Sequence, residues 1–247
     1  MKRILSLIMC VALLLCFCSC SSSDLSSVIK DGVLVVGVTE YEPMDYRDGD
    51  GNWVGFDADL AKLTAERLGV KAEFVIINWE EKVDKLTAKD IDCVWNGYTI
   101  NDIDKVSFSD AYAKNSPVLV VRGDKADVIK DTDDLDGLSV AYEKGSSSER
   151  IAEDLKCDFK KQPLSLQKEA LDSVKNGDAD ACIVDKTIFD SLVHSDLVSV
   201  YTFESEKFAV GFRKGSDLTE EVNRILKELK SEGILDALAD KYKVELT

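Results

Sequence analysis

The stretch Val33-Leu34-Val35-Val36-Gly37-Val38 decides the fold, together with the segments that follow it. This apolar run predicts a buried strand. Helical periodicity follows at Phe56–Leu68, and a second apolar run follows at Ala72–Ile77. A helix near Glu80–Ala88 and a strand at Cys93–Asn96 continue the series. The order strand, helix, strand, helix, strand predicts a mostly parallel sheet flanked by helices.

A second series of the same kind starts in the middle of the chain. It consists of a strand at Leu138–Tyr142, a helix from about Ser148, a helix at Leu166–Lys175, a strand at Ala181–Val184 and a helix after Asp185. Two similar α/β units in one chain predict two lobes. Ligands bind beyond the carboxyl ends of strands in such sheets, so two facing lobes predict a cleft between them.

Two segments connect the predicted lobes. An apolar strand at Ser116–Val121 leaves the first series, and Phe203–Phe212, with a strand at Phe208–Phe212, carries the chain back. Two crossings would form a hinge. An amphipathic pair of helices at Leu218–Tyr242, broken at Gly233, ends the chain. The predicted lobes are residues 32–113 with 207–247, and residues 117–203.

The N-terminus has the pattern of a secretory signal. Two cations precede an apolar run, Ile4–Phe17, which is too short to span a bilayer comfortably. Cys20 follows the small residue Ser19, so residues 17–20 resemble the bacterial lipoprotein signal. We therefore expect a signal peptide at residues 1–19 and a lipid on Cys20. A plain signal peptide with incidental cysteines is the alternative.

The residues after Cys20 predict a flexible tether. Ser21–Ser27 is rich in serine and weakly hydrophobic, and we expect residues 20–31 to connect the anchor to the first lobe. No later window is long and apolar enough for a spanning helix. These features predict an extracytoplasmic domain that is anchored to the cell membrane by its lipid.

Composition excludes several classes of function. The chain carries 47 acidic and 31 basic residues, a formal net charge of −16, so nucleic acid is a poor partner. Three cysteines remain beyond Cys20, which does not suggest a disulfide framework. With His194 as the single histidine, we expect no metal site, no cofactor and no Ser-His-Asp site.

The ordered motifs resemble a known family. The segments that carry the resemblance are Leu34–Val38, Tyr41–Met44, Asp50–Ala61, Asn96–Ile100, Phe108–Tyr112, Lys144–Ser148 and Asp178–Asp185. They are similar to those of family 3 bacterial solute-binding proteins, the amino-acid type of ABC importers. The resemblance implies the type II two-lobe periplasmic-binding-protein fold, a small polar solute such as an amino acid or related amine, an ABC permease as partner, a monomer and no enzymatic activity.

The resemblance also implies site residues in the first lobe. Tyr41 and Phe56 would pack against the apolar part of the solute, one on each side, although both rings could instead belong to the core. Gly97 and Thr99 match positions that receive an α-ammonium group through a carbonyl and a hydroxyl.

In the second lobe, Ser146 and Ser147 match hydroxyl and amide donors at a helix N-terminus, where a carboxylate is favoured. The same residues also form an ordinary N-cap sequence. Asp185 matches the acid that pairs with the ammonium group of the solute, because a buried carboxylate needs a cationic partner.

The sequence departs from the family at one position. Amino-acid binders of the family usually have an arginine there, which binds the α-carboxylate of the solute through two hydrogen bonds. Counting from Thr99 places Asp104 at that position, and counting back from Phe108 places Asp102 there. Either Lys105 or Lys144 then replaces the arginine, or the solute lacks a free carboxylate, or it carries extra positive charge.

Two other functions use the same fold. A sensor would present its liganded form to a membrane receptor. A dehydratase-like enzyme would use a carboxyl group in the cleft as a general acid, but it would also need basic residues for its carboxylated substrate.

Overall fold

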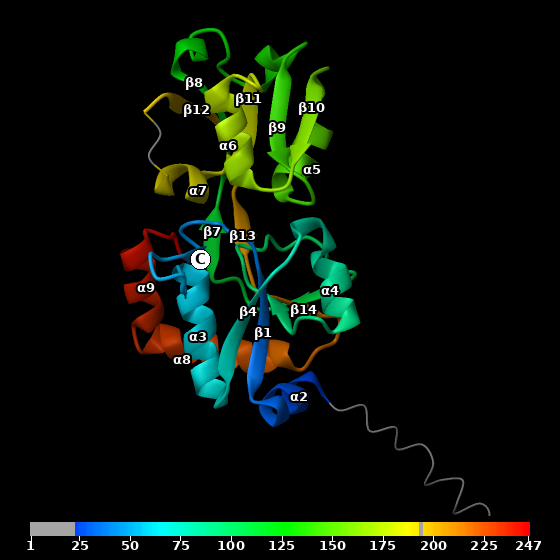
Figure 1. Cartoon of the computed structure of the whole chain (residues 1–247), viewed down its shortest axis with the longest axis vertical. Coiled ribbons are helices and arrows are strands. Elements are labelled where there is room, and N and C mark those ends of the chain that lie inside the picture. Colours follow the sequence, from blue (N-terminus) through cyan, green and yellow to red (C-terminus); the bar gives the residue numbers. More distant parts are fainter. Residues whose placement is uncertain (1–22, 193–194) are drawn as a thin grey trace, which may run out of the picture.

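The computed structural model describes residues 23–192 and 195–247, and it contains two five-stranded sheets that lie one above the other along the long axis (Figure 1). In each sheet one strand runs opposite to the other four, so the predicted mostly parallel α/β architecture is confirmed. The predictions for the signal peptide at 1–19, lipidated Cys20 and the first tether residues lie outside the described residues.

Lobe 1, as we name it, is built on the sheet with strand order β4-β1-β5-β14-β6. Its strands are β1 (Val33–Val38), β4 (Lys71–Ile76), β5 (Cys93–Val94), β6 (Val106–Phe108) and β14 (Gly211–Arg213). Leu34, Val36 and Val38 of β1 are fully buried, as expected for a strand covered on both faces.

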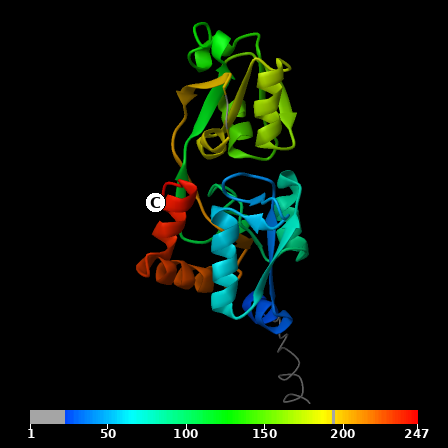
Figure 2. The ribbon, with the colours of Figure 1, turned by 60° about the vertical axis from the view of Figure 1, so that its left-hand side comes forward.

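Helices cover both faces of this sheet (Figure 2). They are α3 (Phe56–Leu68), α4 (Lys82–Ala88), α8 (Leu218–Ser231), α9 (Ile234–Tyr242) and the 3₁₀ turn η1 (Trp79–Glu81); a short hairpin, β2 (Tyr46–Arg47) and β3 (Trp53–Val54), precedes α3. Gly233 has a φ of 76°, a left-handed conformation that favours glycine, and it separates α8 from α9 as predicted.

The prediction of a flexible tether is wrong for residues 24–31, because they form helix α2 (Asp24–Asp31) on lobe 1. The Ser23 side chain accepts a hydrogen bond from the backbone N–H of Ser26, which caps the helix, and Val28 is buried. Arg213 also holds the first turn, since its Nε lies 3.0 Å from Oδ2 of Asp24. Ser23, one of the serines on which the tether prediction rested, thus caps a helix.

Lobe 2 is built on the sheet with strand order β10-β9-β11-β8-β12. Its strands are β8 (Pro117–Arg122), β9 (Ser139–Glu143), β10 (Lys160–Leu164), β11 (Ala181–Asp185) and β12 (Leu197–Thr202). Its helices are α5 (Ser147–Asp154), α6 (Gln167–Asn176) and α7 (Lys186–Ser191), with 3₁₀ turns η2 (Gly123–Lys125) and η3 (Thr132–Leu135).

Two antiparallel strands, β7 (Ala113–Asn115) and β13 (Glu206–Phe208), run between the two sheets (Figure 1). The predicted single strand at 208–212 is wrong, because it is divided between β13 and β14. Ala209 and Val210 lie where the chain leaves the pairing with β7 and joins β5. The exact lobe boundaries stay a prediction.

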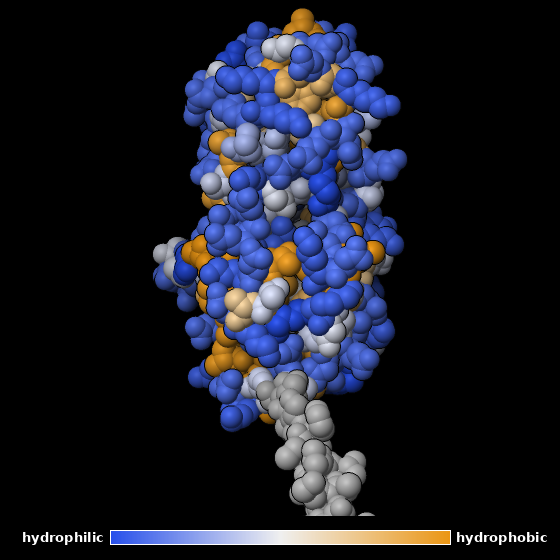
Figure 3. Space-filling model, turned by 90° about the vertical axis from the view of Figure 1, so that its right-hand side faces the viewer, coloured by the Kyte–Doolittle hydropathy of each residue, from blue (hydrophilic) through white to orange (hydrophobic). Residues whose placement is uncertain are grey.

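The surface is mostly hydrophilic. On the face shown in Figure 3, hydrophilic residues predominate and apolar ones form small groups. Cys93, Cys157 and Cys182 are free thiols, and the first and last of them are buried. Within residues 23–192 and 195–247, no helix has the length and apolar character needed to cross a membrane.

Candidate functional site

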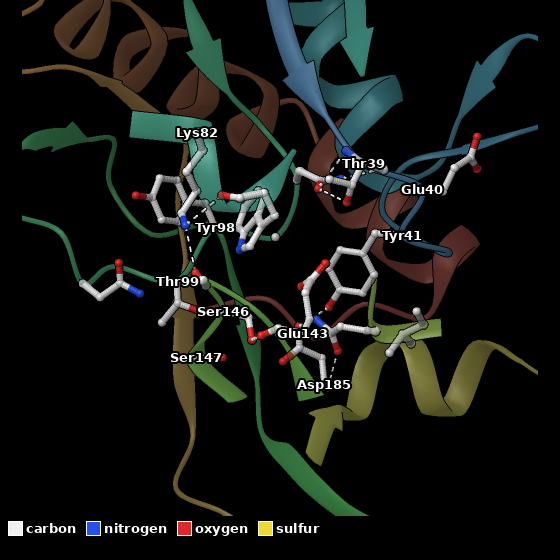
Figure 4. A pocket seen from close by; sticks show the side chains of 17 residues that line it. Thr39, Glu40, Tyr41, Lys82, Tyr98, Thr99, Glu143, Ser146, Ser147 and Asp185 are labelled. Atoms are coloured by element: carbon white, nitrogen blue, oxygen red, sulfur yellow. Dashed lines mark hydrogen bonds between the residues drawn. The ribbon is translucent and has the colours of Figure 1, made fainter. Parts of the chain in front are cut away.

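A cleft lies where the carboxyl ends of strands from the two lobes face each other (Figure 4). It encloses about 440 Å³ of space not filled by atoms, including its mouth, which suits one small solute. Six predicted residues line it: Tyr41, Gly97, Thr99, Ser146, Ser147 and Asp185. They lie just after β1, β5 and β9 and at the end of β11. Ligands bind at these carboxyl ends of strands in such sheets.

Several hydrogen bonds hold Asp185 in place at the cleft. It is 4% exposed, and its carboxylate accepts hydrogen bonds from the Tyr41 hydroxyl (2.8 Å) and from Nε2 of Gln167 (2.6 Å). Nδ2 of Asn115 donates a third, at 2.8 Å. Burial raises the pKa of Asp185, and these neutral donors oppose the rise. The bond from Tyr41 joins lobe 1 to lobe 2.

Two more carboxyl groups lie near Asp185: Glu143 lines the cleft, and Glu206 adjoins it through Ser147. Glu143, the last residue of β9, is 5% exposed, and its pKa is raised to about 8 by burial and by the charge of Asp185. Glu206 accepts hydrogen bonds from Asn115 (2.7 Å) and from the Ser147 hydroxyl (3.2 Å), and burial raises its pKa to about 7. The side chains that donate hydrogen bonds to Asp185 and Glu206 are all uncharged.

Gly97 is placed by buried lobe 1 residues. Its φ is 58°, and a Cβ atom there would lie 2.5 Å from Cε1 of Tyr41, so glycine lets the Tyr41 ring pack against the backbone. The Gly97 N–H donates to Oδ2 of Asp57 at 2.7 Å. Asp57 also accepts from the Tyr112 hydroxyl at 2.8 Å, so a buried carboxylate fixes this turn of the cleft wall.

The serine pair has the capping role that its sequence also allowed. Ser146 is the N-cap of α5; its Oγ accepts from the backbone N–H of Ser148 (3.1 Å), and it donates to the carbonyl of Glu143 (2.7 Å). Both Ser146 and Ser147 still line the cleft.

Lys82 supplies positive charge at the cleft lining. It is the first residue of α4 and is 5% exposed. Its Nζ donates to the carbonyls of Trp79 (3.1 Å) and Gly145 (2.8 Å), and the second bond reaches lobe 2. The nitrogen lies 4.7 Å from the ring centroid of Trp79 and 5.4 Å from that of Tyr98, both cation–π distances.

Two predicted site residues do not lie at the cleft. Phe56 is 0% exposed and packs inside lobe 1, with its ring centroid 6.0 Å from that of Tyr112, because the first turn of α3 directs it into the core. Asp104 is exposed on a turn before β6. Asp102 is half-buried and accepts from the Tyr98 hydroxyl at 2.7 Å.

Comparison with known proteins identifies this architecture. Residues 34–245 match the family of bacterial extracellular solute-binding proteins, family 3. The chain belongs to that family. Its relatives include the arginine-binding extracellular protein ArtP of Bacillus subtilis (strain 168), which is 28% identical over 98% of each chain.

Solved structures of amino-acid-binding proteins share the two-lobe type II fold. The ancestral amino acid-binding protein AncCDT-1, a precursor of cyclohexadienyl dehydratase, is 34% identical, covers 90% of this chain and 99% of its own, and has a TM-score of 0.84. The substrate-binding protein AbpA of Streptococcus pneumoniae bound to L-arginine is 26% identical, covers 87% and 96%, and has a TM-score of 0.81.

Among the lining residues of this family 3 protein that sequence reasoning missed are Trp79, Lys82, Glu143 and Gln167. Glu143 could have been found, because it directly follows the predicted strand at Leu138–Tyr142, at the edge where ligands bind. Lys82 and Gln167 lie near the starts of predicted helices, and their sequence pattern does not show which side chains turn toward the cleft.

Proposed function

We propose that this protein is the extracytoplasmic substrate-binding component of an ABC importer and that it captures a cationic amino acid between its lobes. The observation that supports this choice of solute is the group formed by Glu143, Asp185 and Glu206. No Lys, Arg or His nitrogen within residues 23–192 and 195–247 lies within 4.0 Å of these carboxylates. A guanidinium or ammonium group of the solute would supply the missing counter-charge.

The neutral donors on Asp185 support the same conclusion. Hydrogen bonds from Tyr41, Gln167 and Asn115 hold the carboxylate in place but leave its charge uncompensated. Removing such a charge from water costs several kcal/mol unless a partner compensates it. A cationic solute therefore gains more on binding than a neutral or acidic one.

The lining residues then take distinct roles. Tyr41 and Trp79 offer aromatic faces to the aliphatic part or the cation of the solute. The carbonyl of Gly97 and the hydroxyl of Thr99 accept from ammonium N–H groups, and Ser147 adds a second hydroxyl. Trp79 lines the cleft and takes the packing role expected of Phe56, which is buried in the core.

A thermal-shift screen tests this function. Arginine, lysine, ornithine and histidine should raise the midpoint of unfolding more than glutamate or aspartate at equal concentration, because a ligand of the folded state stabilises it by mass action. Putrescine serves as the cation without a carboxylate. A larger shift with glutamate or aspartate than with any cationic amino acid would contradict the proposal.

The remaining assignments concern the surroundings of the protein. We infer a lipid on Cys20, a monomer and an ABC permease as the membrane partner. Transport is favoured over sensing because named relatives include an ABC transporter glutamine-binding protein.

We also infer that the protein binds its solute without chemical conversion. The alternative is a dehydratase, because AncCDT-1 is described as a precursor of cyclohexadienyl dehydratase. An enzyme that acts on a carboxylated cyclic substrate would need basic residues at the cleft. Among the described lining residues the only Lys or Arg is Lys82, against three acids, Glu40, Glu143 and Asp185. Unchanged arginine recovered after incubation with the protein is the expected result.

A further inference from the structure

Lys82 is a buried cation that lacks an acidic partner in the described part of the chain. It is 5% exposed, and no carboxylate oxygen of the described residues lies within 4.0 Å of its Nζ. Surface lysines of this protein behave differently: Lys144, for example, lies 2.8 Å from Glu80 in an exposed ion pair. A buried charge without a counter-ion is unfavourable, so its presence at a cleft calls for an anion from outside the chain.

The charged groups around Lys82 do not neutralise it. The acids that face it are Asp102, Glu143 and Glu149, and Arg150 adds a second positive charge. Asp102 accepts from the Tyr98 hydroxyl at 2.7 Å, and Glu149 accepts from the backbone N–H of Gly145 at 2.8 Å. The pKa of Lys82 is lowered, chiefly by burial. The three acids raise it but do not cancel the effect of burial.

The hydrogen bonds of Lys82 leave room for a further acceptor. An ammonium group carries three donors. Two of them are used by the carbonyls of Trp79 and Gly145, and both of these acceptors are uncharged. A carboxylate would take the third donor and form the charge-assisted bond that is absent within the described residues.

We propose that Lys82 receives the carboxylate of the bound solute, so that the solute is a cationic α-amino acid and not an amine without a carboxylate. This inference rests on the proposed function and extends it to the opposite end of the solute. It also replaces the two lysines suggested by the sequence. Lys144 is engaged with Glu80 outside the cleft lining, and Lys105 is exposed beside the turn that carries Asp104.

The arrangement of the cleft supports this assignment. Figure 4 shows Lys82 beside Tyr98 and Thr99, whereas Tyr41 and Asp185 lie together on the other side of the cavity. The lining is therefore positive at one end and negative at the other. A solute with a carboxylate at one end and a cationic group elsewhere matches both ends, but a diamine matches only one.

The test compares two ligands that differ by the carboxylate. L-arginine and agmatine, which is arginine without its carboxylate, are titrated by calorimetry into the wild-type protein and into Lys82→Met. Methionine removes the charge but keeps an unbranched side chain that packs between the two rings. Lys144→Met is the matched control, because it removes a cation that also bridges the lobes but lies outside the cleft lining.

We expect Lys82→Met to weaken arginine binding at least about tenfold more than agmatine binding, the equivalent of about 1.4 kcal/mol, because both ligands lose the Lys82–Gly145 contact but only arginine loses a partner for its carboxylate. Lys144→Met breaks only an exposed ion pair between the lobes, so it should weaken both ligands equally and by less than about fivefold. An equal loss for arginine and agmatine would overturn the inference, because Lys82 would then only hold the lobes together through Gly145. Unchanged arginine binding by Lys82→Met would overturn it as well.

Two further outcomes separate this inference from the proposed function. If the wild-type protein prefers a non-cationic amino acid, the proposed cationic solute is wrong, and the same comparison with that amino acid and its decarboxylated amine still tests Lys82. If the wild-type protein binds amines but no α-amino acid, the Lys82 inference is overturned.

Should Lys82→Met fail to fold, the wild-type protein alone still tests the inference. Its affinity for arginine must exceed its affinity for agmatine by about tenfold, and equal affinities would overturn the inference.

Discussion

At the residue scale, the proposed cation binding would depend most directly on Asp185. Asp185→Asn keeps the shape of the side chain but removes its charge, so arginine should bind at least about a hundredfold more weakly, in line with about 3 kcal/mol for the loss of one partner of a buried pair. Calorimetry measures this change. Asp104→Asn, on an exposed turn outside the cleft, should bind arginine as the wild type does, and an equally silent Asp185→Asn would contradict the site.

Glu143 should make stability depend on pH. Burial and the charge of Asp185 raise its pKa from 4.5 to about 8, so the folded state retains a proton that the unfolded state releases. The free energy of unfolding contributed by this group is therefore present below pH 4.5 and is lost as pH rises to about 8. Urea denaturation across this interval should show a smaller decline for Glu143→Gln than for the wild type. Parallel declines would contradict the assignment.

The site residues show what sequence reasoning could reach at this scale. Six of the eight predicted binding residues lie at one cleft, because they follow strands whose carboxyl ends converge. Phe56 was misplaced because an aromatic residue in the first turn of a helix can face either the core or a ligand. Lys82 was missed because its burial depends on Gly145, which is 63 residues away in the chain.

At the scale of elements, α2 depends on an ion cluster with Arg213. The guanidinium lies 3.0 Å from Asp24 and 3.3 Å from Asp92, and the side chains are 11% to 18% exposed. Arg213→Ala leaves both acids without this partner and should lower the free energy of unfolding by about 3 kcal/mol. Arg224→Ala, which breaks only exposed pairs with Glu221 and Glu228, should have little effect on denaturation. Similar losses in both variants would contradict this account.

Elements with a strong local pattern could be predicted from the sequence. Strand β1 and helix α3 have the predicted bounds, because an apolar run and a helical periodicity each specify them locally. Strand β10 was not predicted: its sequence is Lys-Lys-Gln-Pro-Leu, with little apolar character, and it is formed by parallel pairing with β9 at the sheet edge. Helix α2 was missed for a related reason, since its stability comes from contacts with lobe 1.

At the scale of the whole molecule, solute binding should close the lobes. Tyr41–Asp185, Lys82–Gly145 and Lys144–Glu80 contacts join lobe 1 to lobe 2 around the cleft. We propose that β7 and β13 act as the hinge, since these strands run between the sheets. Small-angle scattering should show a smaller radius of gyration at saturating arginine. An unchanged radius would argue against a hinge motion.

The proposed anchor also belongs to this scale. Cys20→Ala should release the protein from membranes without changing its affinity for arginine, because the lipid supplies the attachment and the cleft lies in the folded lobes. Helix α2 begins at Asp24, so a lipid on Cys20 would hold lobe 1 close to the membrane surface. Continued fractionation of Cys20→Ala with membranes would show that Cys20 is not the anchor.

The most direct test of the central claim is a calorimetric titration of the wild-type protein with L-arginine and with L-glutamate. The titration is run at about pH 9, about one unit above the pKa of Glu143 (about 8), so that most Glu143 side chains are ionised. A cleft with Glu143, Asp185 and Glu206 at one end should bind arginine at one site per chain and glutamate much more weakly. Glutamate binding that is as tight as arginine binding, or tighter, would contradict the account.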